Sequence, residues 1–109
     1  MKLKSGAPIF AGMLPGCFPP IPIGAAAITG TTAKLKWASM DSVDHYELQY
    51  RMIGVAGWTT KIVAGIKSFR KVAGLNCDSD YEWRIRTICD DGELSLYSEI
   101  QSFRLARVD

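Results

Sequence analysis

Two stretches of this sequence alternate strictly between apolar and polar side chains, and this alternation limits the possible folds more than any other feature. The apolar side chains fall on every second position in residues 46–50 and again in residues 81–85. A period of two puts all apolar side chains of a β-strand on one face of a sheet. Such strands are typical of antiparallel sheets with one buried and one wet face. The predicted buried side chains are Tyr46, Leu48, Tyr50, Tyr81, Trp83 and Ile85, and the predicted exposed ones are Glu47, Gln49, Arg51, Glu82, Arg84 and Arg86.

Turn-forming residues separate further short apolar runs along the rest of the chain. Gly, Asn, Asp and Ser gather near 29–30, 40–42, 54–57, 64–65, 76–80 and 90–92, and no segment shows a sustained repeat of 3.6 residues. The sequence therefore predicts an all-β fold, a seven-stranded antiparallel β-sandwich. We expect its strands at 23–28, 32–38, 44–52, 57–63, 67–73, 80–89 and 97–105. Phe69 has the wrong parity for the buried face of its strand, so we expect either a bulge there or an exposed Phe69.

Size and charge exclude several classes of protein. A chain of 109 residues with 48% hydrophobic and 22% charged residues is typical of one globular domain,. The net charge is +2 and the isoelectric point about 8.5, which is milder than in most basic nucleic-acid-binding modules, so we expect no nucleic-acid partner. No apolar run approaches the roughly 20 residues that a membrane helix needs, so we expect no transmembrane segment.

Residues 1–22 differ from the rest because they hold all 5 prolines. Proline removes a hydrogen-bond donor and restricts its neighbour, so we expect a proline-rich N-terminal arm or linker, followed by the sandwich at 23–109. A second interpretation is a bacterial lipoprotein signal, in which Lys2 and Lys4 precede an apolar stretch and Cys17 carries the lipid after cleavage. Glycine and proline interrupt that apolar stretch, which favours the linker.

From about residue 20 to 106 the sequence resembles the fibronectin type III family of immunoglobulin-like sandwiches. The likeness is carried by Trp37 on the expected second strand and by the pattern Leu75-x5-Tyr81-x-Trp83-x-Ile85. That pattern resembles the corner before the family's sixth strand, where the tyrosine packs inward and its hydroxyl returns to nearby backbone. The family usually has a proline at the position of Cys77. The resemblance implies a core of Trp37, Tyr46, Leu48, Tyr50, Leu75, Tyr81, Trp83 and Ile85.

The residue pattern of 28–37 and 81–89 is similar to that of fibronectin type III modules in large secreted proteins of Bacteroidetes-like bacteria. The resemblance implies a non-catalytic interaction or spacer module of a larger exported bacterial protein, extracellular or at the cell surface. We expect a monomer whose partner is a protein or a polysaccharide. Two alternatives remain, a small self-standing surface lipoprotein and a carbohydrate-binding module. The latter would use the aromatic side chains not assigned to the core, which are Trp58, Phe69 and Tyr97.

The three cysteines lack the spacing of a structural zinc site, and with one histidine in the chain we expect no metal,. In the fibronectin type III topology Cys77 lies below the start of the sixth strand and Cys89 at its far end. Eight strand residues, roughly 26 Å, separate Tyr81 from Cys89, which is too far for a Cys77–Cys89 disulfide. The first strand begins where the sixth ends, so Cys17 can reach Cys89. Two outcomes stay open: a Cys17–Cys89 disulfide in an exported protein, or three reduced cysteines with Cys77 in place of a turn proline.

The sequence shows no catalytic constellation and implies no cofactor. His45 is the only histidine, and we expect it on the wet face of its strand. Residues 90–93 lack the ligand spacing of a calcium loop, and a turn explains their composition better. No glycine-rich phosphate loop is present. We therefore expect no enzyme.

Two surfaces are candidates for binding, because sandwich modules bind through end loops or an exposed sheet face. The first is a loop end that includes Asp90, Asp91 and Glu93. The second is the outward face of the third, fourth and sixth strands. It is expected to carry Glu47, Gln49, Arg51, Thr59, Lys61, Arg84 and Arg86. Opposite charges on neighbouring strands also predict a simpler outcome for this face, a solvated ladder of ion pairs.

Overall fold

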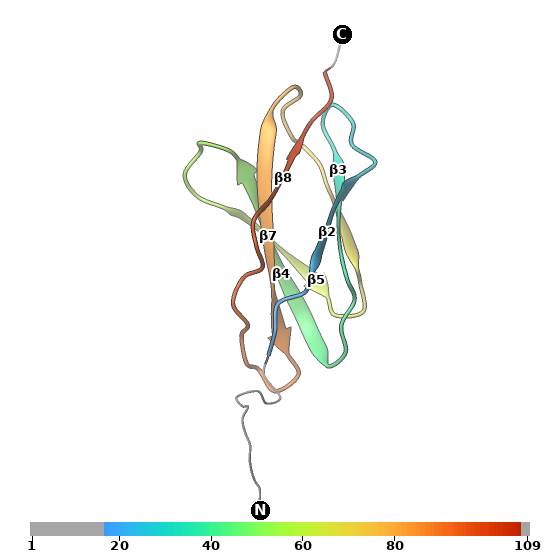
Figure 1. Cartoon of the computed structure of the whole chain (residues 1–109), viewed down its shortest axis with the longest axis vertical. Helices are drawn as coiled ribbons and strands as arrows, with labels where there is room; N and C mark the ends of the chain where they lie inside the picture. Colours follow the sequence, from blue (N-terminus) through green and yellow to red (C-terminus); the bar gives the residue numbers. More distant parts are fainter. Residues whose placement is uncertain (1–16, 108–109) are drawn as a thin grey trace, which may run out of the picture.

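The computed structural model describes residues 17–107, and these form two antiparallel sheets packed face to face (Figure 1). The predicted all-β sandwich with seven antiparallel strands is therefore confirmed. One sheet has three strands in the order β2-β3-β6, and the other has four in the order β5-β4-β7-β8. The strands are β2 Pro22–Ala26, β3 Ala33–Trp37, β4 Val43–Met52, β5 Thr59–Ala64, β6 Phe69–Val72, β7 Asp80–Cys89 and β8 Gln101–Arg104.

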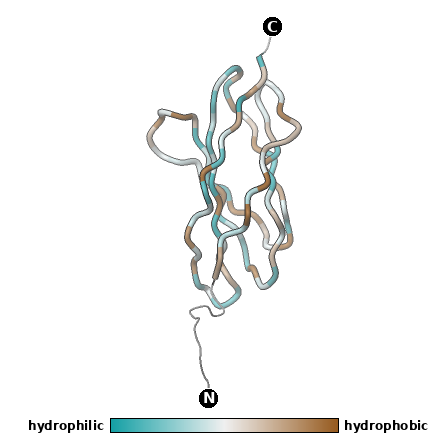
Figure 2. The backbone as a smooth tube through the Cα atoms, viewed as in Figure 1, coloured by the Kyte–Doolittle hydropathy of each residue, from teal (hydrophilic) through white to brown (hydrophobic). Residues whose placement is uncertain are grey.

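The core between the two sheets contains the side chains that the alternation placed on the dry face. β4 and β7 pair over nearly their whole length, with Leu48 opposite Ile85. Figure 2 colours each residue along the backbone by its hydropathy. The Trp37 ring meets Tyr46 edge to face at 5.3 Å between centroids,. The buried core consists of Ala33, Leu35, Trp37, Tyr46, Leu48, Tyr50, Val63, Val72, Leu75, Tyr81, Trp83, Ile85, Phe103 and Leu105.

The corner before β7 has the hydrogen bond that the family resemblance implies. The backbone N–H of Asn76 donates to the Tyr81 hydroxyl at 2.9 Å, so the loop is tied to the strand that follows it. The Tyr81 ring stacks on Phe103 of β8 at 5.8 Å between centroids. Cys77 is exposed with a free thiol at the position where the family usually has proline.

The last strand is shorter than predicted: 97–105 was expected, and β8 covers only Gln101–Arg104. Residues 95–98 still run beside β7, but serine hydroxyls take the place of backbone carbonyls as hydrogen-bond acceptors. The Ser95 and Ser98 hydroxyls accept from the N–H groups of Thr87 and Ile85 at 2.9 and 3.1 Å. Their own N–H groups donate to the carbonyls of the same two residues at 2.9 and 2.8 Å. These four hydrogen bonds satisfy the backbone N–H and carbonyl groups of Ile85 and Thr87 without a regular β-ladder.

Two corrections concern the edge strands. Thr59 and Lys61 pair with the inward-facing Tyr50 and Leu48, so they belong to the inner register and not to the outward face on which we expected them. β5 is an edge strand, and of its inner positions only Val63 is buried. Phe69 is 38% exposed, in unbroken register with β3, which is the exposed alternative rather than the bulge.

The N-terminal predictions fall mostly outside the described residues. The lipoprotein-signal interpretation of residues 1–16 lies there entirely. Within the described part, residues 17–21 form no regular structure, and β2 begins at Pro22. The described chain has no helix of the length and hydropathy that crossing a bilayer requires.

Candidate functional site

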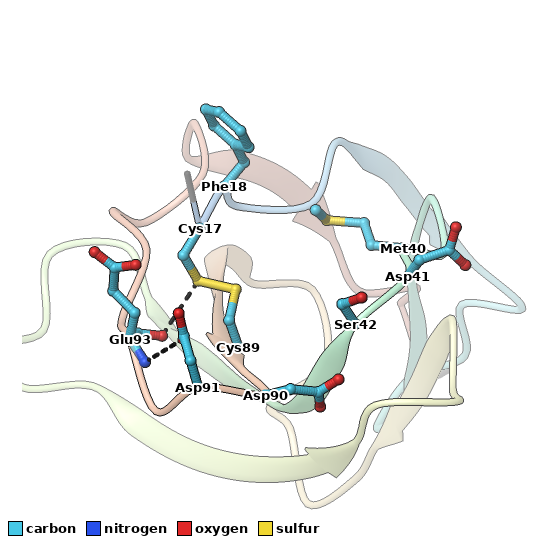
Figure 3. Close-up of a pocket in the computed structure, with 9 residues that line it drawn as sticks. All are labelled: Cys17, Phe18, Met40, Asp41, Ser42, Cys89, Asp90, Asp91 and Glu93. Carbon is cyan, nitrogen blue, oxygen red and sulfur yellow. Dashed lines mark hydrogen bonds between the residues drawn. A yellow bond between two sulfur atoms is a disulfide. The ribbon is translucent and has the colours of Figure 1, made fainter. Parts of the chain in front are cut away.

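A disulfide joins Cys17 to Cys89 at the end of β7, and the two Cα atoms lie 6.0 Å apart. It fastens the segment before β2 to the four-stranded sheet, with Pro20 buried behind it. The Cys17 sulfur lies 3.2 Å from the Glu93 carbonyl oxygen, a contact that Figure 3 marks with a dashed line. Because a disulfide sulfur carries no hydrogen, this contact is packing and not a hydrogen bond.

The predicted binding loop surrounds a shallow hollow of about 280 Å³ beside the disulfide. The Asp91 carboxylate accepts from the Glu93 N–H at 2.9 Å, and Gly92 has φ of 87°, a conformation that favours glycine,. Figure 3 shows the acidic side chains spread round the rim rather than converging. No group of three or more potential metal ligands occurs in the described part of the chain. This acidic turn closes the β7 end, and its geometry implies no ligand.

On the outward face of the four-stranded sheet, three arginines alternate with two aromatic rings, and we call this group the arginine stack. It consists of Arg51, Trp58, Arg84, Tyr97 and Arg86. The guanidinium carbons of Arg51 and Arg84 lie 3.9 and 4.3 Å from the centroid of Trp58. Those of Arg84 and Arg86 lie 4.1 and 4.7 Å from the centroid of Tyr97. Arg84 therefore contacts both rings, as cation–π pairs do.

Each arginine of the stack also has a polar partner on the neighbouring strand. Arg51 Nε lies 2.8 Å from Glu82 Oε2, and Arg86 Nη2 lies 2.6 Å from Glu47 Oε1. Arg84 Nε donates to Gln49 Oε1 at 2.9 Å. The cross-strand register explains these pairs, because Arg51 stands opposite Glu82, Gln49 opposite Arg84 and Glu47 opposite Arg86. The partners neutralise two of the three charges, and the guanidiniums cover the aromatic faces.

The described chain offers no catalytic group beside an activating base. His45 Nδ1 lies 2.7 Å from Asp44 Oδ2, its neighbour in sequence, and no hydroxyl or thiol bonds to either. A second hollow of about 530 Å³ lies beside Trp58, between the loop after β4 and the Gly74–Asn76 turn. The one charged side chain in its lining, Arg51, is already engaged in the stack.

The comparisons with known proteins agree on the fold. No family model matches the sequence, and no curated protein matches it. Among solved structures, the fibronectin type III domain of the human collagen α-1(XX) chain superposes with a TM-score of 0.79 at 21% identity, covering 91% of this chain and 94% of that one.

Two further structures give the same result. A structure titled as a myokine has a TM-score of 0.67 at 18% identity and covers 82% of this chain and 99% of that one. A computationally redesigned β-sandwich protein has a TM-score of 0.71 at 19% identity and covers 84% of this chain and 97% of that one. The chain therefore has a fibronectin type III-like fold. At these identities the likeness shows the fold alone and gives no support to the predicted bacterial lineage, which stays a prediction.

Sequence analysis placed Arg51, Arg84 and Arg86 on one face and predicted a ladder of ion pairs there, but it did not find the two aromatic rings between them. Trp58 and Tyr97 were considered only as the aromatic side chains of a carbohydrate-binding module, because neither belongs to an alternating run. They come from irregular segments next to β5 and before β8. The ion pairs follow from the sequence: positions 47, 49 and 51 are Glu, Gln and Arg, while 82, 84 and 86 are Glu, Arg and Arg, so antiparallel pairing sets acid against base.

Proposed function

We propose that this chain is a non-catalytic connecting module of a larger exported protein, with capacity for surface interaction. The observation that carries the proposal is the position of the two ends of the described chain. Cys17 is bonded to the last residue of β7, whereas Leu105 donates to Ser79, just before β7 begins. A ten-residue strand spans about 30 Å,, so the chain enters at one end of the sandwich and leaves at the other (Figure 1).

The disulfide supports export, because such bonds persist in oxidising compartments. It also bears on the alternatives. A Cys17 sulfur bonded to Cys89 has no free thiol to receive a lipid, which weighs against the lipoprotein. The rings of Trp58 and Tyr97 carry guanidiniums on their faces, which weighs against a carbohydrate-binding module that stacks sugars on them.

A connecting module must transmit tension between its ends, and single-molecule force spectroscopy tests this directly. With handles on both ends of the full chain, the force enters at Cys17, crosses the disulfide and reaches residues 90–107. Unfolding of the oxidised protein then lengthens only that final segment, to about 65 Å at roughly 3.6 Å per residue. Under reducing conditions all of residues 17–107 extend, to about 330 Å.

The matched control is Cys77→Ser, which removes the exposed thiol and leaves the disulfide intact. It should reproduce the short extension of the oxidised chain. A long extension in oxidised protein would show that the disulfide does not carry the load, and the connecting role as proposed would be wrong.

A further inference from the structure

The acidic residues of the described chain are confined to one part of the fold, whereas basic residues occur on both sheets. The three strands β2, β3 and β6 contain no aspartate or glutamate. Residues 17–40 and 52–77, which supply this sheet, β5 and their loops, contain none either. The acidic residues of the described chain lie on β4 and β7, in the loops next to them and in the segment before β8. The three-stranded sheet is therefore a basic layer.

The lysines of this layer share its outward side. Lys34 and Lys36 alternate with the buried Ala33, Leu35 and Trp37, so they point away from the core. Lys71 stands directly opposite Lys34, and Phe69 stands opposite Lys36. Lys67 comes from the loop before β6, and its Nζ lies 5.6 Å from the Phe69 centroid. We call Lys34, Lys36, Lys67 and Lys71 around Phe69 the basic face.

The basic face lacks the internal neutralisation seen on the opposite sheet. Arg51 and Arg86 each have a glutamate partner, and Arg104 has two aspartates. No lysine of the basic face forms an ion pair within 4.0 Å among residues 17–107. The Lys34–Lys71 pair also sets like charges directly opposite each other, which destabilises a sheet. Folding does not require this arrangement, so an anion from outside the molecule is a natural partner for it.

The surface next to these charges has the features of a sugar-binding hollow. A cavity of about 390 Å³ is lined by Ala27, Thr29, Thr32, Lys34, Phe69 and Lys71. The Thr29 and Thr32 hydroxyls are hydrogen-bonded to each other at 2.7 Å, and Thr29 Oγ1 also accepts from the N–H groups of Thr31 and Thr32. Because Thr29 Oγ1 already accepts twice, it donates to Thr32 Oγ1, which leaves the Thr32 O–H free to donate to a sugar oxygen. Lys34 Nζ sits 4.3 Å from the Phe69 centroid. The neighbouring β2 sets the small residues Gly24 and Ala26 opposite Lys36 and Lys34, so a flat polymer can approach the backbone closely there.

We propose that the basic face binds an acidic polysaccharide, which gives the interaction capacity of the proposed function a site and a ligand class. The chemistry of the face separates this partner from two others. Protein interfaces are poor in lysine and have an apolar centre, whereas this face is mostly lysine. Insertion into a membrane surface needs several large apolar side chains. The strands of this sheet expose two, Phe69 and, at the β2 bulge, Ile23, beside the four lysines.

The test measures binding of the full oxidised chain to dextran sulfate and to alginate, with unsulfated dextran as the uncharged reference. The variant K34Q/K71Q removes two charges from the basic face. The control K61Q/R104Q removes the same number from the four-stranded sheet. We expect binding to both acidic polymers and none to dextran. K34Q/K71Q should weaken binding about tenfold or more and reduce its salt dependence by about two released ions, while the control changes it less than about threefold.

Three results would overturn the proposal. They are no binding to either acidic polymer, equal losses in the two variants, or stronger binding to phosphatidylserine vesicles or polyglutamate than to the polysaccharides. Folding is monitored by the melting temperature, which should not fall in K34Q/K71Q because a like-charge pair is removed. A protein that binds no polysaccharide but keeps the short extension under force refutes this inference and leaves the connecting role standing.

Discussion

Removal of the Cys17–Cys89 disulfide should lower the free energy of unfolding by about 4 kcal/mol. The bond closes a loop with a sequence separation of 72 residues, and β2 to β7, six of the seven strands, lie inside it. In the chain-entropy model, closing a loop of this length removes roughly 15 cal/mol/K from the unfolded state, or about 4.4 kcal/mol at 25 °C. Small domains have only about 5–15 kcal/mol in total, so the loss is a large fraction of the stability.

The double variant C17S/C89S and the oxidised chain are compared by urea unfolding followed by tryptophan fluorescence. We expect a lower midpoint in the variant and a larger slope with denaturant, because the open chain exposes more surface when it unfolds. Cys77→Ser is the control, since Cys77 is exposed and unbonded, and it should leave the midpoint unchanged. A difference below about 1 kcal/mol between C17S/C89S and the control would refute the loop argument.

Two further predictions concern buried polar groups. Ser95→Ala leaves the buried Thr87 N–H without its 2.9 Å acceptor, so thermal and urea unfolding should show a loss of about 1–3 kcal/mol. Burial raises the pKa of Tyr46 above its ordinary value of 10.0. The unfolded chain therefore loses that proton first, so its contribution to stability is intact below pH 10 and is lost as the pH rises through the folded-state pKa. Because the Tyr46 hydroxyl has no partner among the described residues, Tyr46→Phe should flatten this alkaline decline without lowering stability at pH 7. A steeper decline in that variant would contradict the reasoning.

The strands that could be predicted from the sequence are those with one fully covered face. β4 and β7 lie in the middle of their sheet, and their alternation in the sequence matches the alternation of their burial. β5 lies at an edge, where an inward position need not be covered by the opposite sheet. Thr59 and Lys61 could therefore be polar and still point inward, which is why their predicted face was wrong.

The start of the last strand could not be predicted, because serine side chains there accept hydrogen bonds that backbone carbonyls would accept in a regular strand. Residues 95–98 run beside β7, where the hydroxyls of Ser95 and Ser98 accept from two of its backbone N–H groups. A sequence pattern counts strands by apolar alternation and turns. It does not register a hydroxyl that replaces a carbonyl across the chain.

The sequence alone determined the class of fold, the parity of the long strands and the absence of a recognisable catalytic motif, since these follow from local periodicity and residue type. Only the tertiary structure decided which separated segments meet. It bonded Cys17 to Cys89, placed Arg84 against both Trp58 and Tyr97 and set Lys34 opposite Lys71. The physical reason is that strand order and register fix contacts between residues dozens of positions apart, and a periodic pattern carries no information about which strand becomes the neighbour.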